Sequence, residues 1–251
     1  MTAVLFAKIP DSLRSDTLAA LVRKSFPHKE NEGYFDVLEK RRNRDSVKES
    51  FAALALLREL LNMRGIGTDR LVFRRSESGK PYFEGMKLRF SLSHSKGYVA
   101  AALSESTEVG IDIECADVPT DRAEKIINRF FCKGCEGCEG CEGEFAPSSP
   151  RAEPSPSAEP SSTAEPSPTA RSFARLWTKT EAYAKMRGTG LGEAISNGDL
   201  LRACTEDERG EAFFEYFDAD GYPLTACLEK KDGEIDFCGI DLEELIKKAE
   251  I

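Results

Sequence analysis

The segment Val109-Gly110-Ile111-Asp112-Ile113-Glu114 constrains the fold most, because it places two acidic side chains in what otherwise looks like a buried strand. Successive side chains of a strand point to opposite faces, so Ile111 and Ile113 share one face while Asp112 and Glu114 share the other. At about 6 Å and an effective dielectric near 20, two such carboxylates repel each other by roughly 2–3 kcal/mol. A positive charge nearby must offset this repulsion.

A divalent cation is one candidate for that charge. Ligands that are all oxygen favour Mg²⁺, which usually takes one or two carboxylates together with substrate phosphates and waters, over zinc or copper. The alternative is a solvated strand end that carries two surface acids. The hexapeptide alone is compatible with both interpretations.

Charge and hydropathy limit the partners and the compartment that we expect. The 251 residues include 35 Lys and Arg against 44 Asp and Glu, a net charge of −9, so nucleic acid is not an expected partner. No apolar run approaches the ~20 residues that a membrane-spanning helix needs. Four of the eight cysteines fall in one short repeat, which argues against a disulfide framework. We therefore expect a cytoplasmic protein with one large domain or two small ones and no membrane contact.

Hydrophobic periodicity predicts a chain of mixed helices and strands. Helices are expected over residues 16–24, 50–63, 121–131, 173–186 and 242–249. Strands are expected over residues 4–9, 88–93, 98–103, 109–114, 213–217, 224–228 and 235–238. Those between 88 and 114 are expected to form a meander with turns at residues 94–97 and 104–108, and those at 213–217 and 224–228 a hairpin that turns at Asp220-Gly221. The meander places Ser93 and His94 at one strand end, where His94 is either a structural imidazole or a donor to a phosphate.

Two further stretches carry charged or glycine-rich patterns. The basic block from Lys40 to Lys48, at the start of the first long helix, is either a solvated charged face or a site for an acidic partner. In the predicted helix 173–186, Trp177 is expected to face the core, with a Glu181–Lys185 pair at its margin. The glycines that follow this helix come after its C-terminus, so they predict a C-cap and not a phosphate loop.

The composition changes abruptly between Lys133 and Ala170. A Cys-Glu-Gly triplet repeats, an Ala-Glu-Pro-Ser unit recurs, and seven of the 12 prolines lie here. Such a segment cannot bury enough apolar surface to offset its ordering entropy, so we expect a disordered insertion. The run from Cys132 to Cys141 also has the spacing of an iron–sulfur or zinc site, and a metal or redox protein that uses this run is an alternative function.

The order and spacing of several motifs together resemble the 4′-phosphopantetheinyl transferases of the surfactin-synthetase type. The segments that match are Gly79-Lys80-Pro81, Phe90-Ser91-Leu92-Ser93-His94-Ser95, Gly110 to Glu114, Arg129-Phe130-Phe131, and Leu176 to Lys185 with Gly188 to Leu191. They cover most of the chain outside the insertion. Two positions depart from the family's pattern: Thr180 stands where a lysine is usual, and Lys48 and Glu49 straddle the place of a basic residue.

The resemblance implies an α+β fold of two similar lobes related by a pseudo-twofold axis, with the active site in the cleft between them. Residues 1–104 would form the N-terminal lobe. Residues 105–132 and 171–251 would form the C-terminal lobe, and residues 133–170 the disordered insertion.

The resemblance also implies an enzyme that transfers 4′-phosphopantetheine from coenzyme A to a serine of an apo acyl or peptidyl carrier protein and releases 3′,5′-ADP. Asp112, Glu114 and Glu181 would hold Mg²⁺ on the pyrophosphate. Glu181 would also take the serine proton, and Lys185 would stabilise the leaving phosphate. Six further residues would bind coenzyme A: Lys48, Gly79, Lys80, Pro81, Ser93 and His94.

Carrier proteins of this class are acidic, so the basic block at Lys40 to Lys48 is a candidate docking surface. A non-catalytic coenzyme A or nucleotide binder of the same fold is a second alternative, which Thr180 favours. The motifs do not indicate which carrier protein is modified or whether acyl-coenzyme A is accepted.

Overall fold

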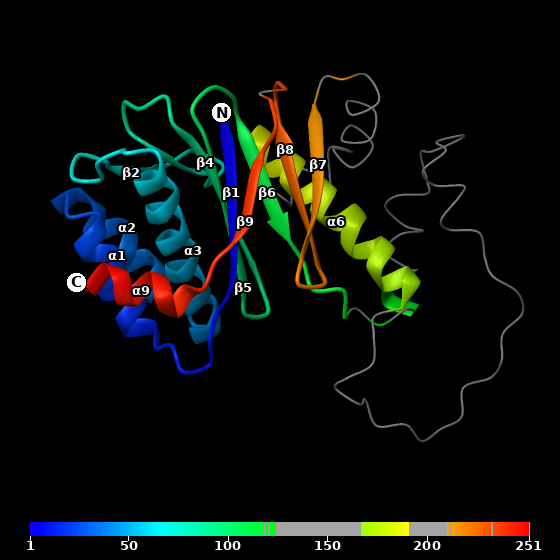
Figure 1. The fold of residues 1–251 in the computed structure, drawn as a ribbon, viewed down its shortest axis with the longest axis horizontal. Coiled ribbons are helices and arrows are strands. Elements are labelled where there is room, and N and C mark those ends of the chain that lie inside the picture. The colour runs from blue at the N-terminus through cyan, green and yellow to red at the C-terminus, as the bar shows by residue number, and fades with distance from the viewer. Residues whose placement is uncertain are drawn as a thin grey trace, which may run out of the picture.

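The computed structural model describes residues 1–117, 119, 121–123, 167–190, 210, 212–231 and 233–250. Its helices and strands confirm the predicted α+β class (Figure 1). Three predicted features lie outside the described residues: the Arg129-Phe130-Phe131 motif, the cysteine run from Cys132 to Cys141, and Leu191. The same holds for most of the predicted insertion and for all but the first turn of the helix predicted over residues 121–131.

A four-stranded sheet forms the centre of the molecule. Its strand order is β4 (Arg89–Ser95), β5 (Tyr98–Ser104), β1 (Thr2–Lys8) and β9 (Asp236–Gly239). β1 is antiparallel to β5 and parallel to β9, so a strand from the C-terminal end of the chain lies beside the first strand. The β4–β5 turn is limited to Lys96 and Gly97, which both have positive φ, as a two-residue hairpin turn requires.

Helices cover one face of this sheet (Figure 1). They are α1 (Ser15–Ser25), α2 (Glu32–Glu39), α3 (Arg44–Met63) and α9 (Leu242–Glu250), with a short 3₁₀ turn at Lys29–Asn31 before α2. α3 begins six residues before the predicted start because the Asn43 side chain accepts the N–H groups of Asp45 and Ser46 and caps the helix there. β9 and α9, although predicted for the C-terminal lobe, pack with the sheet and helices of residues 1–104.

Two smaller sheets complete the fold. β2 (Phe73–Arg75) pairs with β3 (Pro81–Phe83) beside the helical layer. A three-stranded antiparallel sheet has the order β6 (Val109–Ile113), β8 (Tyr222–Leu228) and β7 (Phe213–Ala219). The hairpin between β7 and β8 turns at Asp220 and Gly221, as predicted.

The predicted meander is wrong at its third strand. β6 pairs with β8 and not with β5, because β1 and β4 already occupy the two edges of β5. Instead, Ile111 and Ile113 pack onto the face of the large sheet that the helices leave uncovered, against side chains such as Phe6 and Ala100. The pattern of alternating side chains was therefore correct, while the partner strand was not.

α6 (Pro168–Arg187) covers the other face of the three-stranded sheet (Figure 1). It begins within the predicted insertion, because Ser167 caps it and proline at the first helical position suits a helix start. It ends at Gly188, which has a φ of 71° and donates its N–H to the Ala184 carbonyl, so the predicted C-cap is confirmed. Among the helices that the structure describes, none has the length and apolar character that a membrane crossing requires.

Trp177 does not face the core as predicted. It is half-buried and lies against Phe173, at 5.6 Å between ring centroids, while the smaller Thr178 and Ala182 take the buried face. Small side chains are needed there because α6 passes very close to the β6 backbone at Gly110. An ideal Cβ on Gly110 would lie 1.9 Å from the Ala182 carbonyl oxygen.

We expect Gly110→Ala to lower the free energy of unfolding by about 1–3 kcal/mol, because overpacking would force α6 away from β6. Chemical denaturation of the purified variant measures this loss. Gly33→Ala is the matched control, since Gly33 is exposed in α2 and a Cβ there meets nothing within 4 Å. The control should be neutral or slightly more stable than wild type. A Gly110→Ala protein as stable as the control would contradict the close approach.

Candidate active site

β6 meets β4 through serine side chains and not through a backbone ladder. Three backbone N–H groups of the β6 segment donate to serine Oγ atoms of β4: Ile111 to Ser91 at 3.0 Å, Ile113 to Ser93 at 3.3 Å, and Cys115 to Ser95 at 3.2 Å. We call these three contacts the serine seam. It joins the edge of the small sheet to the face of the large one, and the alternation of β4 is what brings all three serines to one side.

The two acids of β6 lie at this seam. Ser93 Oγ donates to Asp112 Oδ1 at 2.6 Å, and Ser95 Oγ donates to Glu114 Oε1 at 2.8 Å. Asp112 is only 3% exposed, so the alternative of two solvated surface acids is wrong for this residue. Burial of a charged carboxylate requires a partner of opposite charge.

Lys185 of α6 is that partner. Its Nζ lies 2.6 Å from Asp112 Oδ1, 3.0 Å from Ser93 Oγ and 3.6 Å from Glu181 Oε2. The positive charge that the sequence required is thus a lysine in this structure. The second oxygen, Asp112 Oδ2, is buried and has no hydrogen-bond partner among the described residues. Such an oxygen is costly to leave unpaired, and it can accept a further cation or donor.

Burial and neighbouring charges raise the pKa of two of these carboxyl groups. Burial first, and then the negative charges of Asp112 and Glu114, raise the pKa of Glu181 to about 7 against the lowering effect of Lys185. Burial also raises the pKa of Glu114, and the charge of Asp112 adds to this. Glu181 is therefore an acid that exchanges a proton near neutral pH, as a general base requires.

The donor chemistry of this cluster fits a hard cation. Asp112, Glu114 and Glu181 offer only oxygen ligands, and Asp112 Oδ2 is already unpaired. Within the described part of the chain, no three acidic, histidine or cysteine side chains form a ready-made set of metal ligands. Lys185 holds the position beside Asp112 that a cation would compete for.

A cleft opens beside Lys185. A cavity of about 250 Å³ is lined by Gly79, Lys80 and Pro81 together with Glu181 and Lys185. A second cavity of about 530 Å³ shares Lys80 and Pro81 with the first and continues it toward the C-terminal end of α6. The structure thus brings together five of the predicted site residues that lie far apart in the sequence.

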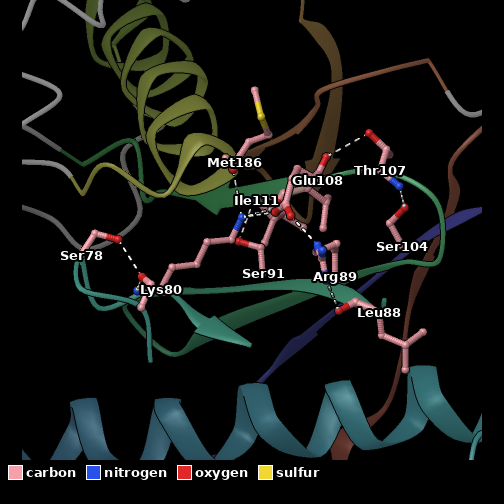
Figure 2. A network of polar contacts seen from close by, with 12 residues as sticks. Ser78, Lys80, Leu88, Arg89, Ser91, Ser104, Thr107, Glu108, Ile111 and Met186 are labelled. Atoms are coloured by element: carbon pink, nitrogen blue, oxygen red, sulfur yellow. Dashed lines mark hydrogen bonds and ion pairs between the residues drawn. The ribbon is translucent and has the colours of Figure 1, made fainter. Parts of the chain in front are cut away.

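Lys80 connects the walls of this cleft (Figure 2). Its Nζ donates to Glu108 Oε2 at 2.8 Å, to the Met186 carbonyl at 2.9 Å and to the Val109 carbonyl at 3.4 Å. Glu108 also pairs with Arg89. An ammonium group has three hydrogens, so all the donors of Lys80 are used within the protein. Lys80 in this state fastens the turn before β3 to the end of α6.

His94 and Lys48 lie outside both cavities. His94 Nδ1 is 2.9 Å from Glu49 Oε2, and the other Glu49 oxygen accepts the N–H of Gly97 at 2.8 Å. Lys48 Nζ donates to the Pro10 carbonyl at 3.0 Å. Both are thus bound to groups near the β4–β5 turn.

Sequence reasoning missed the roles of Glu108 and Ser95. Glu108 stands in a predicted turn, where an acid normally indicates a surface residue. Ser95 also falls in a predicted turn, although the regular spacing of two residues along Ser91, Ser93 and Ser95 is a signal that β4 continues to it.

Comparison with known proteins agrees with this geometry. A family model described as the 4′-phosphopantetheinyl transferase superfamily matches residues 108–234, about half of the chain. That stretch contains Asp112, Glu114, Glu181 and Lys185.

Relatives with this activity in their names extend the match. The chain is 27% identical over 193 residues to the 4′-phosphopantetheinyl transferase gsp of Aneurinibacillus migulanus, which covers 76% of this chain and 68% of the relative. It is 33% identical over 126 residues to the 4′-phosphopantetheinyl transferase AcpT of Salmonella typhi, which covers 50% of this chain and 54% of that one. The predicted resemblance is confirmed, and the chain belongs to the 4′-phosphopantetheinyl transferase superfamily, a family of transferases.

Proposed function

We propose that this protein transfers 4′-phosphopantetheine from coenzyme A to a serine of an apo acyl or peptidyl carrier protein, in a reaction that depends on Mg²⁺. The observation that carries the proposal is the cluster of Asp112, Glu181 and Lys185 at the edge of a cleft lined by Gly79, Lys80 and Pro81. A carboxylate cluster can hold Mg²⁺, and the ion can in turn bind phosphate oxygens. Such a cluster at the edge of a cleft therefore suits a substrate whose reacting group is a pyrophosphate.

Glu181 is the proton acceptor in this proposal. Its pKa of about 7 allows it to take the proton of the carrier serine, directly or through a water. The serine oxygen then attacks the phosphorus that carries pantetheine, and the bond from that phosphorus to the bridging oxygen breaks. The bridging oxygen leaves with 3′,5′-ADP. Lys185 stabilises the charge that develops on this leaving phosphate.

Asp112, Glu114 and Glu181 are the residues that would hold Mg²⁺. The ion supplies positive charge at the pyrophosphate when it is bound. Asp112 contributes the unpaired Oδ2, which needs no rearrangement of its hydrogen bonds to accept a ligand. With a cation held at Asp112, this carboxylate would no longer need Lys185 to balance its charge, and Lys185 could contact the substrate.

Coenzyme A binds along the cleft in this proposal, with Gly79, Lys80 and Pro81 forming one wall. The family resemblance also assigns Ser93, His94 and Lys48 to phosphate binding. Ser93 lies at the serine seam beside Asp112 and Lys185, whereas His94 and Lys48 lie near the β4–β5 turn, outside the two cavities. His94 and Lys48 already lie on neighbouring segments there, since Glu49 contacts both His94 and Gly97. The carrier protein is expected to be acidic, and the basic block that opens α3 is its proposed contact.

The two-lobe arrangement remains part of the proposal. Each of the two larger sheets has helices on its outer face, which supports one lobe built on residues 1–104 and one built on residues 105–132 and 171–251, with residues 133–170 inserted. The exception is the C-terminal end of the chain, because β9 and α9 pack with the first lobe. We propose a cytoplasmic location and no nucleic-acid partner, on the grounds of charge.

The non-catalytic alternative loses its main support. Thr180 is 3% exposed, its hydroxyl donates to the Leu176 carbonyl at 2.9 Å, and it lines neither of the two cavities. The alternative that uses the run from Cys132 to Cys141 lies outside the described residues.

The proposed reaction can be tested directly. The protein is incubated with coenzyme A, Mg²⁺ and apo carrier proteins of fatty-acid, polyketide and peptide synthesis, and intact mass is recorded. We expect one carrier serine to gain a phosphopantetheine group and 3′,5′-ADP to appear in equal amount. A panel that stays unmodified at saturating enzyme would contradict the activity.

We expect Asp112→Asn to reduce turnover roughly 100-fold, the scale seen when one charge-stabilising group is removed from an active site. The variant keeps the shape of the side chain but binds Mg²⁺ more weakly, so excess Mg²⁺ should restore part of the rate. Titration of activity against Mg²⁺ measures both effects. Asp69→Asn, at an exposed acid, is the control. Superimposed Mg²⁺ curves for Asp112→Asn and wild type would remove Asp112 from the metal site.

The raised pKa of Glu181 predicts the direction in which activity and stability change with pH. As a base it must be deprotonated, so kcat/KM should rise with pH and then level off. Bound Mg²⁺ favours the ionised carboxylate, so this rise should lie below the pKa of about 7 that Glu181 has in the metal-free protein. Its pKa is higher in the folded than in the unfolded state, so its contribution to stability is full at low pH and is lost as pH rises to about 7. Glu181→Gln should abolish most activity and should gain stability relative to wild type over the same interval. Parallel stability–pH curves for the two proteins would contradict the raised pKa.

A further inference from the structure

The serine seam performs two tasks with the same hydroxyl groups. Ser93 and Ser95 each accept an N–H from β6 and each donate to an acid of β6. In both cases the acid immediately precedes the residue whose N–H is accepted. The repeat of this geometry at two successive serines makes it a built arrangement, because the spacing of two residues is the same on both strands.

Ser91 lacks the second task. It accepts the Ile111 N–H at 3.0 Å (Figure 2), but the residue before Ile111 is Gly110, which has no side chain to receive its proton. Gly110 is required by the close approach of α6. Ser91 is therefore an internal control. It joins the two sheets as Ser93 and Ser95 do, but it does not contact an acid.

We propose that Ser95 is a positioning residue that orients the Glu114 carboxylate for metal binding. The Ser95 hydroxyl donates to Glu114 Oε1 at 2.8 Å, and the Cys115 N–H reaches the same oxygen at 2.9 Å. Two donors on one oxygen fix the rotation of the carboxyl group. The other oxygen, Oε2, takes part in neither of these hydrogen bonds. Ser93 has the same relation to Asp112, whose Oδ2 is the unpaired atom.

Hydrogen bonds from neighbouring groups to a ligating carboxylate commonly change metal affinity by about 10- to 100-fold. This inference rests on the proposed function, because it assigns a role within the same Mg²⁺ site.

The test is Mg²⁺ binding in the presence of coenzyme A and without any carrier protein, measured by calorimetry, with Mn²⁺ and electron paramagnetic resonance as a second readout. Ser95→Ala should weaken Mg²⁺ binding about 10-fold. Ser91→Ala loses a comparable backbone contact, so both variants should show a similar fall in melting temperature, but Ser91→Ala should leave Mg²⁺ affinity unchanged. Ser95→Thr keeps the hydroxyl and should restore wild-type affinity.

A double variant shows whether Ser95 acts through Glu114. In a Glu114→Gln background, Ser95→Ala should cause no further loss of Mg²⁺ affinity. If Ser95→Ala is too unstable to study, Ser95→Cys, with a similar size and a weaker donor, should show an intermediate loss. Equal Mg²⁺ affinity for Ser95→Ala and Ser91→Ala would overturn the inference and leave Ser95 a purely structural residue.

The same experiments separate this inference from the proposed function. If wild type modifies a carrier protein but the Ser95 variants bind Mg²⁺ as wild type does, only the role of Ser95 fails. If wild type modifies no carrier protein, the proposed function fails whatever the variants show.

Discussion

The buried ion pair between Asp112 and Lys185 is the interaction on which the rest of the site depends. Taking a carboxylate out of water costs several kcal/mol unless a charged partner and hydrogen bonds replace the solvent. Here α6 supplies the lysine at 2.6 Å, and β4 supplies the Ser93 hydroxyl at the same distance. Gly110 allows α6 to come close enough to β6 for this contact. Three elements that are distant in the sequence are thus held together around one acid.

The serine seam explains why the site lies where it does. Two sheets that joined through a continuous backbone ladder would use all their edge groups on each other. In this protein the β6 N–H groups meet serine hydroxyls, and two of those hydroxyls pass a hydrogen bond on to an acid. A structural joint between the sheets therefore also supports the two carboxylates that we propose as metal ligands. Side chains that are held in this way keep their orientation before a ligand arrives.

The two lysines that line the cleft are bound to groups of the protein in this structure. Lys80 is engaged with Glu108 and two carbonyl groups, and Lys185 with Asp112 and Ser93. With a net charge of −9 on the chain, an anionic substrate is not attracted at long range. In the proposed reaction, binding of a pyrophosphate together with a cation would be an exchange of partners, in which lysines move from protein acids to phosphate. The cation would then assist substrate binding as well as the chemistry.

The sequence alone determined the features that depend on neighbours in the chain. Alternation identified the strand that carries Asp112 and Glu114, turn residues located the β7–β8 hairpin, and Gly188 marked the end of α6. Motif order predicted the family, because it lists residue types without requiring their positions in space. Only the tertiary structure decided the partner of β6, the exposure of Trp177, the pairing of Lys185 with Asp112 and the contact of Ser95 with Glu114. Those features depend on which edges are already occupied and on how closely two backbones approach, and neither is encoded within a few residues.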